Sequence, residues 1–186
     1  MKKITLLLLT VISLNAFSQE KSEKYPQDSN KRNELKIDAF SLIAFSSLDI
    51  NYEYLLNKDT SLGIDVFYNF GDPNSDSDLY FARKFSLTPY YRWFFSEERF
   101  ARGFFVEGFG MLNTFEDDIY YSYSSIRTEK ETSFALGVSV GGKFVTKSGF
   151  TAEVSLGVGR NLFNTNNINI DNSLVTRGGI SIGYRF

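Results

Sequence analysis

The chain has 186 residues, contains neither histidine nor cysteine, and is 17% aromatic. Without these two residue types it lacks the commonest general base, any thiolate nucleophile and the usual ligands of zinc. Its 20 basic and 22 acidic residues give a net charge of −2, which offers no basic surface for nucleic acid.

Residues 1–18 have the features of a secretory signal peptide. Lys2 and Lys3 precede an apolar run of about 11 residues, and small residues follow at the spacing that a signal peptidase reads. The run is too short to cross a bilayer as a helix, which needs roughly 20 residues. We therefore expect cleavage after Ser18, which removes two lysines and no acid and leaves 168 residues with a net charge of −4.

Residues 19–33 show no period and are expected to form a flexible periplasmic lead. From there to the end, apolar and polar residues alternate, which is the period of a β-strand. Residues 34–186 are therefore predicted to form one domain of eight strands. The predicted strands span residues 34–44, 47–56, 61–70, 85–95, 103–113, 133–145, 150–159 and 174–186.

Short and long connections alternate between these strands. Those after the second, fourth and sixth strands are short and polar, whereas those after the third, fifth and seventh are long, at residues 71–84, 114–132 and 160–173. The first connection, around residues 45–46, is also short. An even number of strands with short turns at one end and long loops at the other is typical of a transmembrane β-barrel, with the turns in the periplasm.

One face of the predicted strands is apolar and aromatic, and the other is polar. Alternation alone does not tell which face points inward, because a soluble barrel would bury the apolar face. A soluble eight-stranded barrel could hardly hold so many rings in its lumen, so we predict that the apolar face meets lipid. The polar face is predicted to form a charge network in the lumen, made of Lys36, Asp38, Asp49, Glu53, Asp65, Arg92, Glu107, Lys143, Glu153, Arg177 and Arg185.

The last strand places Ile180, Ile182, Tyr184 and Phe186 on one face and ends on the phenylalanine. This ending resembles the assembly signal of Gram-negative outer-membrane barrels, whose final strand closes with an aromatic residue facing lipid. The resemblance implies recognition by the barrel-assembly machinery and a location in the cell outer membrane.

Nearly all of the chain after the signal peptide resembles the small eight-stranded barrels of the OmpA/OmpX type. Residues 35–42 and 48–54 also resemble the opening hairpin of the DUF3575 group of Bacteroidota outer-membrane proteins. These resemblances imply an all-β fold, an antiparallel up-and-down transmembrane barrel, and they bring no catalytic residues with them.

The charge network has two interpretations. In the first interpretation the network is a plug whose charges pair with one another, because an unpaired charge away from water costs several kcal/mol. The interior of an eight-stranded barrel is also only just wide enough for its own side chains. In the second interpretation the charged side chains line a gated ion path or a proton relay. Residue size favours the plug, since inward positions are bulky on the third to fifth strands and small on the last three. We expect the bulky groups to lie across the lumen against the glycine-rich wall.

The long loops offer a weaker candidate site. Residues 72–78 place oxygen ligands at every second position, as a calcium loop does, but Ser77 and Arg83 stand where that loop needs glycine and a closing acid. A solvated acidic loop is the simpler interpretation, and a divalent-cation bridge to lipopolysaccharide phosphates is the alternative. The basic residues suited to direct phosphate pairing are Arg83, Lys84, Arg127 and Lys130.

The sequence thus predicts a monomeric, non-enzymatic outer-membrane barrel with a plugged polar lumen and a structural or surface-interaction role, with no cofactor, no metal and no nucleic-acid partner. Its expected partners are outer-membrane lipid, lipopolysaccharide and the barrel-assembly machinery. The alternative is a porin-like narrow pore or transporter component. A second alternative, a lipid-modifying enzyme, would have to rely on carboxylates, lysine or tyrosine, since the chain has no histidine or cysteine.

Overall fold

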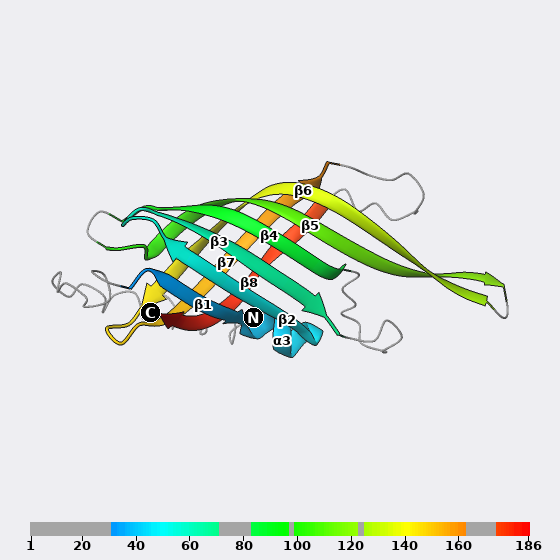
Figure 1. Cartoon of the computed structure of the whole chain (residues 1–186), viewed down its shortest axis with the longest axis horizontal. Helices are drawn as coiled ribbons and strands as arrows, with labels where there is room; N and C mark the ends of the chain where they lie inside the picture. The colour runs from blue at the N-terminus through cyan, green and yellow to red at the C-terminus, as the bar shows by residue number, and fades with distance from the viewer. Residues whose placement is uncertain (1–30, 71–82, 97–98, 123–124, 163–173) are drawn as a thin grey trace, which may run out of the picture.

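The computed structural model describes residues 31–70, 83–96, 99–122, 125–162 and 174–186, which form a closed antiparallel β-barrel (Figure 1). The strands follow one another around the barrel in chain order, and β8 pairs with β1 to close it. This confirms the predicted fold class. The elements are β1 (Asn33–Asp38), α3 (Ala39–Phe45), β2 (Ser47–Leu55), β3 (Thr60–Asn69), β4 (Arg83–Phe94), β5 (Gly103–Ser122), β6 (Ser125–Val145), β7 (Phe150–Asn161) and β8 (Leu174–Arg185).

Five strands, β2, β3, β4, β7 and β8, begin and end within two residues of their predicted bounds. The predicted signal peptide, most of the predicted lead and the acidic loop at residues 72–78 lie outside the described residues. In the part of the chain that the structure describes, no helix is long and apolar enough to cross a membrane.

The first predicted strand, residues 34–44, is wrong in its second half, because β1 ends at Asp38 and the helix α3 follows. A short apolar run such as residues 39–43 fits both periods, so alternation alone does not separate strand from helix there. The local signal for the helix is Asp38, whose carboxylate accepts a hydrogen bond from the backbone N–H of Ser41 at 2.7 Å and caps the helix. Ser46, in the left-handed region at φ 48°, ends it.

The fifth and sixth predicted strands are too short, because most of the long loop predicted at residues 114–132 continues β5 and β6. The backbones of the two strands stay paired out to Ser122 and Ser125. β4 pairs with β5 only as far as Phe115, and β7 pairs with β6 only as far as Ala135. Beyond those points β5 and β6 form a two-stranded ribbon that projects from the barrel at the end away from the C-terminus (Figure 1).

The apolar face points outward, as predicted. Neighbouring residues show the alternation: Trp93 is 57% exposed and Arg92 is 2% exposed, while Val138 is 60% exposed and Ser139 is 4% exposed. The exposed apolar row extends around the barrel and includes Ile180, Ile182, Tyr184 and Phe186 of the last segment. The barrel therefore has an apolar outer surface and a polar interior, which is the arrangement of a transmembrane barrel.

Bulky inward residues contact the glycines, as expected, but the prediction that the bulky side chains lie across the lumen is wrong for Phe105 and Phe109. Phe109 and Phe105 of β5 are the direct cross-strand partners of Gly137 and Gly141 on the adjacent β6. A Cβ built on Gly137 would lie 2.3 Å from the Phe109 ring, and one on Gly141 would lie 2.5 Å from the Phe105 ring. Each ring thus lies sideways over the glycine of its neighbouring strand instead of across the lumen, because only glycine leaves room for that approach.

Candidate functional site

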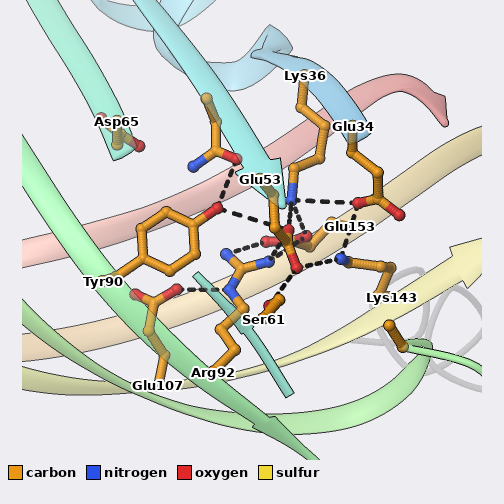
Figure 2. Close-up of polar contacts among 12 residues, drawn as sticks. Glu34, Lys36, Glu53, Ser61, Asp65, Tyr90, Arg92, Glu107, Lys143 and Glu153 are labelled. Carbon is orange, nitrogen blue, oxygen red and sulfur yellow. Dashed lines mark hydrogen bonds and ion pairs between the residues drawn. The ribbon is translucent and has the colours of Figure 1, made fainter. Parts of the chain in front are cut away.

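Acidic and basic side chains alternate in the interior of the barrel, and Figure 2 shows the central part of this series. At the end with the short turns, the Arg185 Nε donates to Glu34 Oε1 at 2.7 Å. Lys143 Nζ joins the two neighbouring carboxylates, Glu34 Oε2 at 2.8 Å and Glu53 Oε1 at 2.7 Å. Lys36 Nζ donates to Glu53 Oε2 at 2.5 Å. Each of these side chains is almost completely buried.

Arg92 lies at the centre and binds three carboxylates. Its guanidinium contacts Glu107 at 2.6 Å, Glu53 at 3.0 Å and Glu153 at 2.7 Å. Glu153 also accepts a hydrogen bond from Lys36 at 2.7 Å. The ring centroids of Tyr90 and Phe105 lie 4.5 and 4.2 Å from the guanidinium carbon. The two nearby rings and the three carboxylates hold the guanidinium in place.

Toward the loop end, Arg177 continues the series. It donates to Glu107 and, at 3.0 Å, to Asp65 Oδ2. Hydroxyls fill remaining acceptor sites, since Ser61 donates to Glu53 at 2.6 Å and Ser139 donates to Glu107 at 2.9 Å. We call the connected set the charge ladder, and it consists of Glu34, Lys36, Glu53, Asp65, Arg92, Glu107, Lys143, Glu153, Arg177 and Arg185.

The ladder contains nine of the eleven residues predicted for the lumen network, including all five bases. The other two lie nearby in different roles: Asp38 caps α3, and Asp49 lines a cavity at the loop end. Glu34 belongs to the ladder although the network prediction omitted it. The signal was present, because Glu34 shares the polar face of β1 with Lys36 and Asp38.

The short-turn end of the interior is covered by the turn before β5. Arg185 donates to the backbone oxygens of Phe100 at 3.1 Å and Ala101 at 2.8 Å. Ala101 is fully buried and packs with Leu55, Phe94 and Phe105. Its backbone N–H donates to the oxygen of Lys58 at 2.7 Å, which holds the turn beneath the barrel.

Arg83 does not occupy the surface position expected of a phosphate-binding residue. It is buried, donates to Met111 Sδ at 3.0 Å and to the Thr176 oxygen at 3.3 Å, and lies 4.8 Å from the centre of the Phe67 ring. The cause is the register shift between Arg83 and Phe85 of β4, which interrupts the alternation and brings Arg83 to the inner face. The side chains of Arg127 and Lys130 are not among those described, and Lys84 lies 5.8 Å from the Tyr68 ring centre.

A cavity of about 190 Å³ lies at the loop end, above the ladder. Its charged lining consists of Asp49, Asp65, Arg83 and Arg177. Within the described ranges, no group of three or more acidic residues is placed to hold a metal ion.

A family model described as "Protein of unknown function (DUF3575)" matches residues 4–178 of the chain. The chain is also similar to the N-terminal β-barrel domain of Pseudomonas aeruginosa OprF, with 12% identity, a TM-score of 0.56, and coverage of 84% of this chain and 96% of that one. Neisserial surface protein A is 11% identical, with a TM-score of 0.45 and coverage of 84% and 94%. The comparison with curated proteins found no match. At these identities, the OprF barrel supports the fold alone.

Proposed function

We propose that this chain, which belongs to the DUF3575 family, is a non-enzymatic, non-conducting barrel of the cell outer membrane with a structural or surface-interaction role. The observation that carries the proposal is the charge ladder. Its five bases and five acids are paired along the interior, and no more than 12% of any of these side chains is exposed.

The energetics of these pairs support a plugged lumen. An ion that entered would have to displace Arg92 or Lys143 from buried carboxylates, and breaking one buried pair costs about 3–5 kcal/mol. An eight-stranded barrel has an interior only just wide enough for its own side chains. The turn at Ala101, which covers the interior at the short-turn end, is a further obstruction to an ion.

The outer surface and the sequence support the location. The exposed apolar row suits lipid, the predicted signal peptide directs export, and the terminal aromatic row would be read by the barrel-assembly machinery. We expect a monomer, because closure of β1 on β8 leaves the barrel wall, in the part of the chain that the structure describes, without a free strand edge for a second copy. Lipopolysaccharide is the expected partner of the rim facing the cell exterior.

The chemistry of the interior supports a non-enzymatic role. The ladder carboxylates are engaged with lysine, arginine and hydroxyl groups, and the chain has no histidine or cysteine to replace them. General acid–base catalysis needs a group that can exchange a proton with substrate. The carboxylates at the centre of the ladder are buried among their partners and are therefore poorly placed to exchange a proton with a substrate.

Single-channel recording on the folded full chain in planar lipid bilayers tests the proposal. We expect no discrete conductance steps from the wild type at neutral pH. Arg92→Ala is the matched variant, and it should conduct more than the wild type because it removes the side chain that joins three carboxylates. Steady conductance steps from the unmodified protein would overturn the plug and establish a narrow pore instead.

A further inference from the structure

The wall of the barrel changes its construction beside β1 at the loop end. β1 ends at Asp38, and its pairing with β8 ends there, opposite Ser181. β8 extends further, to Leu174, so among the described residues its loop-side half has no strand partner on that side. The helix α3 lies beside both β2 and β8 at this place. A helix uses its backbone groups internally, so side-chain packing closes the wall here instead of a strand ladder.

The loop-end cavity lies at this place and reaches the outer surface. Its lining includes buried inward residues such as Asp65 and Thr88, together with the exposed Phe40 of α3. Exposed residues of β7 and β8 also line it, namely Leu156, Thr176 and Gly178. Leu156 is 71% exposed and belongs to the outward apolar row. Because residues of both faces line it, the cavity passes through the wall between α3 and β8 and opens on the lipid side.

The size and lining of the cavity suit a small amphiphilic group. Its volume is about 190 Å³, whereas one water needs roughly 10–15 Å³ and a pocket for a drug-sized ligand measures roughly 300–1,000 Å³. Four apolar side chains line it, those of Phe40, Phe67, Met111 and Leu156. The cavity therefore has room for the head group of a lipid and the start of one chain, while the rest of the chain would lie in the bilayer.

The charged groups of the lining already have partners. The carboxyl groups of Asp49 and Asp65 hydrogen-bond to each other. Arg177 is bound to Asp65 and Glu107, and Arg83 donates to a methionine sulfur and a backbone oxygen. A charged ligand would have to break one of these contacts to gain a counter-charge. The cavity therefore favours an uncharged polar group.

Thr88 supplies a group that such a ligand can satisfy. Its side chain is 1% exposed and lines the cavity. Within the described residues, its hydroxyl has no hydrogen-bond partner, which is unfavourable for a buried polar group. A hydroxyl can both donate and accept, so it matches the hydroxyl group of a ligand without any need for charge.

We propose that the cavity binds the uncharged, hydroxyl-bearing head group of a single-chain lipid of the monoacylglycerol class. The head lies against Thr88, and the chain leaves past Phe40 and Leu156 into the bilayer. The opening on the lipid side favours a ligand that arrives from the membrane, and the small volume favours one chain over two. The proposal rests on the outer surface facing lipid and holds whether or not the lumen conducts.

NMR spectroscopy of the isotopically labelled full chain, folded in phosphatidylcholine nanodiscs, tests the proposal with four probes. Monolaurin is the uncharged amphiphile, dodecane lacks a head group, and dodecyl sulfate and dodecyltrimethylammonium carry an anionic and a cationic one. We expect monolaurin to shift the backbone amide signals of Thr88 and Gly178 saturably, with an affinity roughly tenfold or more above the other three. Absence of a localised, saturable shift, or equal affinity for any comparison compound, would overturn the proposal.

Two variants with matched controls locate the site. Thr88→Val keeps the side-chain shape and should weaken monolaurin binding severalfold. Thr151→Val is its control, because Thr151 is fully buried, has no hydrogen-bond partner for its hydroxyl within the described residues, and lies outside the lining. Phe40→Ala should also weaken binding severalfold, whereas Leu42→Ala, at an exposed residue of the same helix outside the lining, should not. Heat-modifiable gel mobility identifies the variants that fold. Unchanged affinity in folded Thr88→Val or Phe40→Ala would contradict the assignment.

Discussion

Arg92 shows why the buried charges of this barrel are tolerated. Arg92 is 2% exposed, and its guanidinium contacts three carboxylates and lies within 4.5 Å of the centres of two aromatic rings. Removing a charge from water is costly, and only good geometry with several partners compensates for that cost. The same geometry makes each member of the ladder dependent on its neighbours, so removal of one leaves others unpaired.

We predict that Arg92→Ala lowers the free energy of unfolding by about 3–5 kcal/mol, because it leaves buried carboxylates without their shared cation. Urea unfolding in lipid vesicles measures this loss. Arg92→Lys should fall between the wild type and Arg92→Ala, since it keeps the charge and loses the planar fork. The control is Lys58→Ala at an exposed base, expected within about 0.5 kcal/mol of wild type. Equal stability of Arg92→Ala and the control would contradict the central role of Arg92.

At the scale of the element, each strand presents one face to lipid and the other to the ladder. β6 and β7 show this division with small inward residues and exposed aliphatic residues such as Val138 and Leu156. Charged substitutions on a lipid face are costly near the centre of the bilayer and much less so at its edges. The two faces of one strand should therefore respond differently to polar substitution.

Val138→Arg should destabilise the barrel by about 2–4 kcal/mol, because it places a charge against the hydrocarbon. Ser155→Asn should cost less. Ser155 lies on the inner face of β7 and is only partly exposed, so an uncharged amide at this position does not meet the hydrocarbon. Refolding yields and urea midpoints in vesicles compare the two variants. The reverse order of stability would show that the inward and outward faces of these strands are assigned the wrong way round.

At the scale of the whole molecule, the barrel depends on the closure of β8 against β1. Tyr184 pairs with Leu35, and the backbones of Phe186 and Asn33 exchange hydrogen bonds of 2.8 and 3.0 Å. An open barrel would expose unpaired backbone groups to lipid, where each costs several kcal/mol. The last strand thus completes the fold, and its outward aromatic residues extend the apolar surface.

We predict that changing both Tyr184 and Phe186 to serine leaves the chain in the periplasm as a degraded or aggregated species, because the barrel is not assembled. Fractionation of cells followed by gel mobility with and without heating measures the outcome. Changing the exposed Thr146 and Ser148 of a short turn to alanine provides the control. Normal heat-modifiable mobility of the double serine variant in the outer-membrane fraction would refute the assembly role.

The sequence by itself determined the number of strands, the face that each presents to lipid, and the bases of the ladder. These features follow from alternation, a local property that each segment of about ten residues carries independently. That is why Lys36, Arg92 and Lys143 could be assigned to the interior before any partner was known. Alternation was insufficient at residues 39–45, where a short and mostly apolar run fits both a strand and a helix.

Only the tertiary structure decided which charges meet. Lys143 binds Glu34, 109 positions away in the chain, because closure of the barrel brings distant strands into one narrow interior. The same closure sets Asp49 of β2 and Arg83 of β4 on one cavity, and it turns Phe105 and Phe109 over the glycines of β6. Such contacts depend on register and on the distances between side chains across the barrel, which no single segment encodes.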